Sequence, residues 1–64
     1  MKITIERPKK TVTMEYEGAA IDLLKKLEIP SEEVLIIRNG ELVTEDEQLK
    51  DDDTIELLSV ISGG

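Results

Sequence analysis

The first third of the sequence contains two short stretches in which polar and apolar residues alternate. Ile3 and Ile5 stand between polar neighbours, which is the period-2 pattern of a strand with one buried face. Residues 8–10 interrupt the alternation, which resumes over residues 11–16. The pattern predicts two strands joined as a hairpin. The apolar face of the second strand would carry Val12, Met14 and Tyr16.

After Gly18 the apolar residues change to spacings of three and four. This stripe is typical of an amphipathic helix that buries one face. We expect the helix to end near Glu28, because Pro30 cannot continue it and disfavours helical backbone at Ile29. Its start offers Glu17-Gly18 instead of the Ser, Thr or Asp cap that helices prefer. The stripe consists of Ala20, Ile21, Leu23, Leu24 and Leu27.

The second half of the chain predicts three more strands. Residues 34–38 are apolar and rich in β-branched side chains, and residues 41–43 would be a short return strand. Asn39-Gly40 between them favours a type I′ hairpin turn, in which both central residues have positive φ. Residues 55–61 form a second apolar run, which we expect to be the last strand.

The connection before the last strand, residues 45–53, is mostly acidic and has Leu49 as its one apolar anchor. We expect a surface loop with room for one helical turn. Its last residues, Asp51, Asp52 and Asp53, lack the alternate spacing and turn glycine of a calcium loop, so we expect solvated charges and no metal site.

Five short strands and one amphipathic helix bury their apolar faces most simply as a sheet with the helix across one face. The predicted fold class is therefore α+β, with a mixed sheet of four to five strands. We expect a single domain over residues 1–62 and a flexible tail at 63–64. A chain of 64 residues has only a marginal core, so each buried side chain contributes a large share of the stability.

Composition restricts the functions that the chain can have. It contains no Cys and no His, which excludes thiol nucleophiles, disulfides and the usual zinc sites. The formal net charge of −7 opposes binding to nucleic acid and favours a basic partner surface. The sequence begins without the apolar segment of a signal peptide and has no run of transmembrane length. We expect a cytoplasmic protein that is not an enzyme and does not bind membranes.

The most informative residues are Gly63 and Gly64, which directly follow the last apolar run. Without side chains, they would let the terminal carboxylate enter a narrow channel in another protein. The alternative is an ordinary frayed terminus, since small residues collect there.

The order of elements, Asn39-Gly40 and the block 53–64 together resemble the ubiquitin-like sulfur carriers of the ThiS/MoaD family and the small archaeal ubiquitin-like modifiers. The resemblance implies a β-grasp fold. It also implies that an ATP-dependent activating enzyme adenylates the carboxylate of Gly64, for conversion to a thiocarboxylate or for conjugation. ATP and Mg²⁺ would be bound by that enzyme, and the chain itself would bind no cofactor.

Alternation along the last strand predicts a second site. If Ile55, Leu57 and Ser59 face the helix, then Glu56, Leu58 and Val60 face outward. An outward Ile37 would complete an apolar patch with Leu58 and Val60, and such patches often bind partners. The alternatives are that the tail covers Leu58 and Val60, or that the register is reversed.

We therefore expect a sulfur carrier that is activated at Gly64. The alternatives are a small protein modifier conjugated to lysines through the same terminus, and an acidic, non-catalytic β-grasp binding module. The expected partners are the adenylating enzyme and either a sulfur-accepting synthase or the lysines of target proteins. The chain's own lysines are better explained by solubility than as acceptors; they are Lys2, Lys9, Lys10, Lys25, Lys26 and Lys50.

Overall fold

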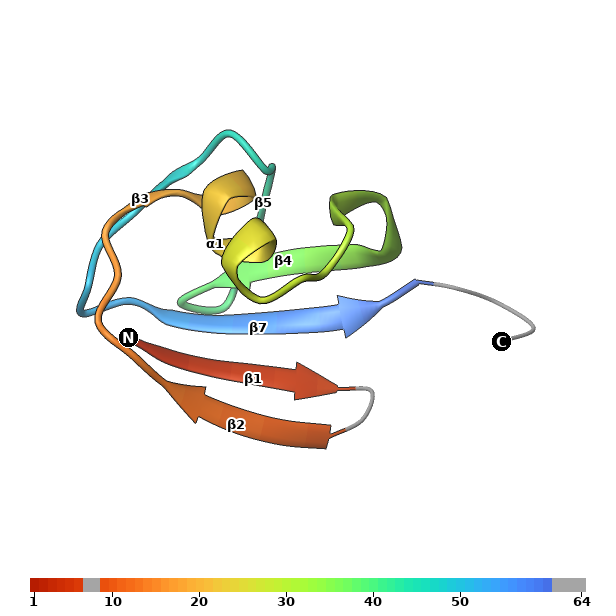
Figure 1. The fold of residues 1–64 in the computed structure, drawn as a ribbon, viewed down its shortest axis with the longest axis horizontal. Coiled ribbons are helices and arrows are strands. Elements are labelled where there is room, and N and C mark those ends of the chain that lie inside the picture. The colour runs from red at the N-terminus through yellow and green to blue at the C-terminus, as the bar shows by residue number, and fades with distance from the viewer. Residues whose placement is uncertain (7–8, 61–64) are drawn as a thin grey trace.

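The computed structural model describes residues 1–6 and 9–60. Its helix and its five longer strands follow the expected order, and two short strands and a 3₁₀ turn were not expected (Figure 1). The elements are β1 (Lys2–Glu6), β2 (Lys9–Thr13), β3 (Gly18–Ala19), α1 (Ala20–Lys26), the 3₁₀ turn η1 (Ser31–Glu33), β4 (Val34–Arg38), β5 (Glu41–Val43), β6 (Gln48–Leu49) and β7 (Thr54–Ser59).

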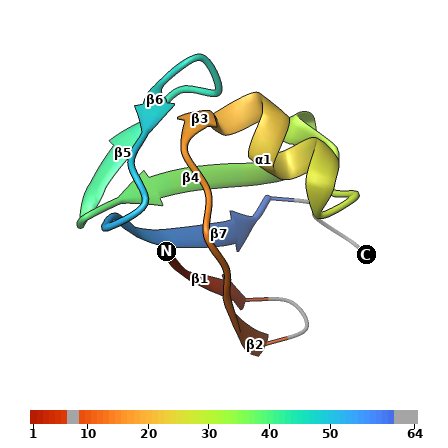
Figure 2. The ribbon, with the colours of Figure 1, turned by 60° about the vertical axis from the view of Figure 1, so that its left-hand side comes forward.

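Five strands form one mixed sheet in the order β2-β1-β7-β4-β5. The central pair, β1 and β7, is parallel, and the other three pairs are antiparallel. Figure 2 shows α1 lying across one face of this sheet, with β3 and β6 paired beside it. A helix held by a mixed sheet whose first and last strands lie in parallel at its centre is the β-grasp fold, as expected.

The core lies between α1 and the inner face of the sheet. Leu24 from the helix and Leu57 from β7 are each 1% exposed, so both belong to it. The remaining members of this core are Ile3, Ala20, Leu23, Ile36, Leu49 and Ile55. The predicted helical stripe and the alternation in β1 and β7 therefore supply most of the buried side chains.

The second strand lies earlier in the chain than the alternation predicted. Lys9 and Lys10 belong to β2, where they pair with Glu6 and Ile5 of β1, and the strand ends at Thr13. The expected interruption at these lysines was wrong, because β2 is an edge strand on which lysine side chains reach water. Val12, Met14 and Tyr16 still pack against the core, as their shared face suggested.

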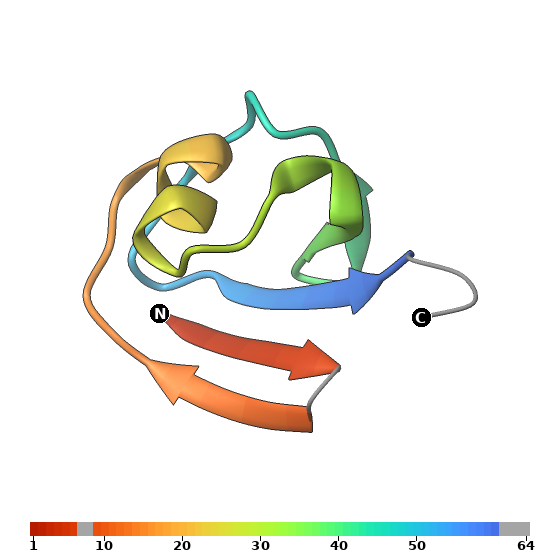
Figure 3. The ribbon, with the colours of Figure 1, turned by 45° about the vertical axis from the view of Figure 1, so that its right-hand side comes forward.

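The helix begins without a side-chain cap, as the sequence indicated, because Ala19 makes no side-chain hydrogen bond there. Instead, the backbone N–H groups of Ala20 and Ile21 donate to the carbonyl oxygens of Glu47 (2.9 Å) and Glu45 (2.8 Å). Figure 3 shows this connecting segment beside the start of α1. The acidic connection thus satisfies two of the N–H groups that every helix leaves free at its start.

The helix ends one to two residues earlier than predicted, with Leu27 as its C-terminal cap. Glu28 follows with a φ of +59°, a left-handed conformation that a glycine would adopt without strain. Asn39 and Gly40 have φ values of +50° and +87°, which confirms the predicted turn between β4 and β5. No helix in the described part of the chain is long and apolar enough to cross a membrane.

The acidic connection is more ordered than a surface loop. Gln48 and Leu49 form β6, which pairs with Ala19 and Gly18, and Leu49 is the expected buried anchor. The prediction of three solvated aspartates was wrong for Asp53, whose side chain is buried. It holds for Asp52, which is exposed. Asp51 is also exposed, but it accepts a hydrogen bond from the Tyr16 backbone N–H at 2.8 Å and lies 3.5 Å from the N-terminal ammonium group.

Candidate functional site

The two faces of β7 carry different kinds of side chain, and this difference defines the candidate site. Ile55 and Leu57 point into the core, whereas Leu58 lies half-buried on the outer face of the sheet, away from α1. The predicted register is therefore correct and the reversed one is excluded. Ser59 is exposed rather than covered by the helix.

Apolar side chains from three strands meet on the outer face. The register places Leu35 of β4 directly opposite Leu58, and Ile37 directly opposite Leu42 of β5. Directly opposed side chains lie about 5 Å apart, so each pair is in contact range. Leu35 is 42% exposed and Leu42 66%, although both are large apolar residues. We call Leu35, Ile37, Leu42, Leu58 and Val60 the outer-face patch.

Val60 extends the outer-face patch beyond the end of β7. Its backbone N–H donates to the carbonyl oxygen of Glu33 at 2.9 Å, which holds this part of the chain beside η1. Its side chain is 45% exposed. The structure thus places the three predicted patch residues, Ile37, Leu58 and Val60, on the outer face or at its end, and whether a partner binds them stays a prediction.

Sequence reasoning missed Leu35 and Leu42 as members of the outer-face patch. The sequence contains a pattern that places each of them on the outer face. Leu35 stands two residues before Ile37, so strand alternation puts the two on the same face. Leu42 is the residue that a two-residue turn at Asn39-Gly40 sets opposite Ile37.

A polar cluster lies at the opposite end of β7, and it is satisfied within the chain. Asp53 Oδ2 accepts hydrogen bonds from Arg38 Nε (2.8 Å) and the Lys50 backbone N–H (2.7 Å), and its Oδ1 accepts one from Asn39 Nδ2 (2.9 Å). Arg38 also donates to Glu47 Oε2 at 2.9 Å. In the described residues, no buried side-chain nitrogen or oxygen lacks a partner.

These hydrogen bonds determine the direction in which the pKa of Asp53 shifts. Burial by itself raises the pKa of its carboxyl group, but the hydrogen bonds from Lys50, Asn39 and Arg38, with the Arg38 charge, outweigh burial and lower it. In return, the hydrogen bond to Asp53 raises the pKa of the Arg38 guanidinium. An ionised and fully bonded carboxylate is a poor proton donor or acceptor, so this cluster is structural.

The remaining predicted groups are the activation residues, the lysines and the acidic residues. The activation residues Gly63 and Gly64 lie outside the described residues. Every lysine of the chain is exposed in the structure. In residues 1–6 and 9–60, no three acidic side chains gather in an arrangement that would hold a metal ion.

Comparisons with known proteins place the chain in a family. Residues 4–64 match the model of the ThiS family. The sulfur carrier protein TtuB of Thermus thermophilus is 32% identical over 65 residues, which cover 100% of both chains. The solution structure of a thiamine biosynthesis protein from Geobacter metallireducens is 28% identical, with a TM-score of 0.60, and the match covers 100% of this chain and 88% of that one. Sequence, fold and relatives agree that the chain belongs to the ThiS family of ubiquitin-like proteins.

Proposed function

We propose that this chain is a sulfur carrier whose C-terminal carboxylate, on Gly64, is activated and then carries the sulfur. Membership of the ThiS family is the observation that carries the proposal, because the matched region runs to Gly64. The full-length similarity to a protein named as a sulfur carrier supports it further. The absence of cysteine from the chain adds a chemical reason, since no side-chain thiol is available to bear sulfur.

The chemistry needs a partner enzyme. A carboxylate is a poor acyl donor, because its oxygen is a poor leaving group. An ATP-dependent enzyme would join the Gly64 carboxylate to AMP and release pyrophosphate. A hydrosulfide-level nucleophile would then attack the carbonyl carbon, so that a C–S bond forms, the C–O bond to AMP breaks and AMP leaves. The product is a thiocarboxylate, which a sulfur-accepting synthase would use.

The outer-face patch would bind that activating enzyme. Its five residues offer an apolar surface on a rigid sheet, and three of them, Leu35, Leu42 and Val60, are exposed by more than two fifths. A few side chains near the centre of an interface, buried in pockets of the partner, carry most of the binding energy. Val60 is four positions before Gly64, so a partner that covers it is close enough to receive the terminus.

To test this, the chain is incubated with its adenylating enzyme, ATP and a sulfide donor. A thiol-alkylating reagent is then added. Because the chain has no cysteine, alkylation reports a thiocarboxylate. We expect one label per chain and release of AMP and pyrophosphate. Mass alone would be ambiguous, since oxidation of Met1 or Met14 adds nearly the same mass as exchange of oxygen for sulfur.

The matched controls alter only the terminus. Deletion of Gly64 should abolish labelling, since it withdraws the carboxylate by about 3.5 Å, and displacements of about 1 Å already slow catalysis strongly. Gly63→Ala should slow labelling by adding a methyl group to the segment that enters the channel. If the chain without Gly64 is still labelled, the terminus is not the reactive group, and a non-catalytic binding module becomes the better explanation.

A further inference from the structure

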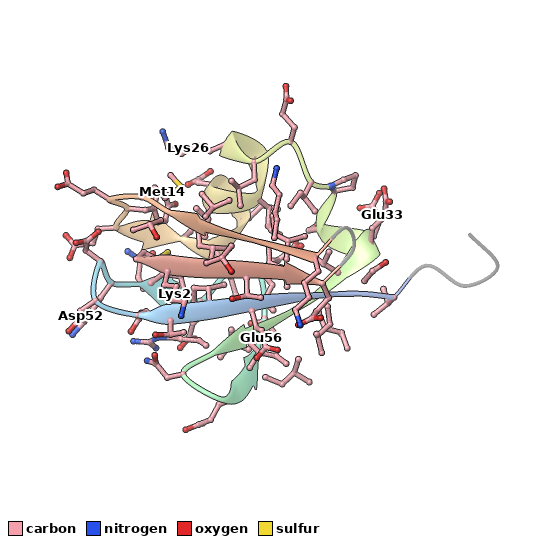
Figure 4. All side chains as sticks on the ribbon, turned by 90° about the horizontal axis from the view of Figure 1, so that it is seen from below. Lys2, Met14, Lys26, Glu33, Asp52 and Glu56 are labelled. Carbon is pink, nitrogen blue, oxygen red and sulfur yellow. The ribbon has the colours of Figure 1, made fainter. Side chains whose placement is uncertain are left out.

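The outer face carries two acidic side chains at the border of its apolar half, Glu6 on β1 and Glu56 on β7, and Glu56 is the one on the central strand that carries Leu58. Glu56 is half-buried on β7, two residues before Leu58 on the same face. The register places it beside Ile37 of β4 and Thr4 of β1. Figure 4 shows it between the two ends of the molecule that Asp52 and Glu33 mark. Glu56 therefore stands where the outer-face patch meets the polar half of the sheet.

Within residues 1–6 and 9–60, no hydrogen bond or ion pair satisfies the carboxylate of Glu56. The contrast with the polar cluster is clear, because Asp53 and Glu47 both have Arg38 as a partner. The position opposite Glu56 on β1 is a threonine, and Lys2, two positions earlier on the same face, pairs with Thr54 and makes no ion pair with Glu56. Glu56 thus keeps its bonding capacity for water or for another molecule.

We propose that Glu56 is the specificity-determining residue of the outer-face patch, and that it selects an activating enzyme that presents an arginine or lysine to it. This inference rests on the proposed function. An enzyme surface that covers Leu58 and Ile37 also removes water from Glu56. Loss of water from a carboxylate is costly unless a cation replaces it. A purely apolar surface would therefore be rejected, and one with a matching cation accepted.

The electrostatics of the chain favour the same partner. The formal net charge of −7 attracts a basic surface over a longer range, before contact is made. Arginine is the better match at contact, because its planar guanidinium forms two parallel bonds to a carboxylate and is more weakly hydrated than an ammonium group. Apolar pockets alone would not distinguish this carrier from another with a similar patch, whereas a charge at its border does.

A second explanation is that Glu56 keeps the patch soluble. A charge beside exposed leucines discourages two copies from pairing through this face. The two explanations make opposite statements about Glu56→Gln, which keeps the size and removes the charge. The solubility explanation expects self-association with unchanged recognition by the enzyme. The proposal expects weaker recognition.

The test measures the KM for the chain and kcat in ATP–pyrophosphate exchange, with the adenylating enzyme that loads the wild-type chain. We expect Glu56→Gln to raise KM about tenfold, equivalent to about 1.4 kcal/mol, and Glu56→Lys to raise it further. Glu56→Asp should recover part of the loss. The kcat should not change, because Glu56 is eight positions from Gly64 and does not touch the reacting group. Glu17→Gln is the matched control, since Glu17 is exposed just before β3, outside the five-stranded sheet, and its loss changes net charge equally.

Each outcome decides between the explanations. An unchanged KM for Glu56→Gln, with normal loading of the wild type, overturns the proposal, and self-association of that variant in sedimentation would then support the solubility role. A fall in kcat without a change in KM also overturns it, because recognition would not be affected. If the wild-type chain itself is not loaded at Gly64, the proposed function fails and this inference fails with it.

Discussion

The side chains at the two ends of β7 have opposite environments, one buried and hydrogen-bonded and the other partly exposed to solvent. Where β7 begins, Asp53 is 5% exposed and takes three hydrogen bonds from its own chain. Where β7 stops, Leu58 and Val60 are left partly uncovered. A buried carboxylate must be bonded, whereas an exposed apolar side chain costs a folded protein little. We conclude that the first end serves stability, whereas the binding surface that we propose lies at the second.

The largest effect is expected from truncating neighbouring leucines on opposite faces of β7. Leu57→Ala should lower the free energy of unfolding by about 2–5 kcal/mol, because it leaves a cavity in the core. Leu58→Ala should lower it by less than about 1 kcal/mol, because Leu58 is half-buried on the outer face. Urea unfolding of both variants measures the two values.

The pair also contains its own control, since both variants make the same chemical change one residue apart. A loss from Leu58→Ala as large as that from Leu57→Ala would mean that the outer-face patch is part of the core. The distinction between the two ends of β7 would then be lost.

The polar end predicts the next largest effect. Asp53→Ala should lower the free energy of unfolding by about 2–3 kcal/mol, because it leaves the partners of a buried carboxylate unsatisfied. The matched control is Asp52→Ala, which removes an exposed carboxylate one position earlier. It should change the same quantity by less than about 0.5 kcal/mol. Equal losses from both variants would contradict a structural role specific to Asp53.

The three aspartates also show where prediction from sequence ends. Asp51, Asp52 and Asp53 are chemically identical and adjacent, so no local pattern says which one is buried. The choice is made by Arg38 and Asn39, which lie 15 and 14 positions earlier and reach Asp53 only after β4 and β7 have paired. Contacts between distant segments of this kind depend on the assembled sheet rather than on local periodicity.

Features with a local cause were predictable. The helix was predictable because Leu23, Leu24 and Leu27 follow the helical period. The turn was predictable because Asn39 and Gly40 readily adopt the positive φ that a type I′ turn requires. The start of α1 was not predictable in the same way, because its caps are backbone carbonyl oxygens of Glu45 and Glu47, and any residue has such an oxygen. The missing cap was visible in the sequence, but the segment that replaces it was not.

The pH dependence of stability gives a third and smaller effect at the polar end. Because the pKa of Asp53 is lowered in the folded state, its carboxylate stabilises the fold above the ordinary aspartate pKa of about 3.9. That contribution is lost as pH falls through the lowered pKa and the proton enters. The difference in unfolding free energy between the wild type and Asp53→Asn should be greatest near pH 7 and decline below about pH 4.

Denaturant unfolding at a series of pH values measures this difference. Asp52→Asn is the control, and its difference from the wild type should stay small throughout. If the difference for Asp53→Asn grew as the pH fell, the sign of the linkage would be reversed. The pKa of Asp53 would then be raised in the folded state, with burial outweighing the hydrogen bonds.

The apolar end predicts the smallest effect on stability and a large one on binding. Leu58→Glu should change the free energy of unfolding by less than about 1 kcal/mol, because a half-buried outward position lets the new carboxylate reach water. The same change should raise the KM for loading at Gly64 by at least about tenfold, since a charge replaces a side chain that fills an apolar pocket.

Leu42→Glu, from β5, tests whether the outer-face patch acts across its full width. Lys50→Ala, at the polar end, should leave loading unchanged. A folded Leu58→Glu variant that is loaded as well as the wild type would remove the outer-face patch from the mechanism, and both ends of β7 would then serve the fold alone.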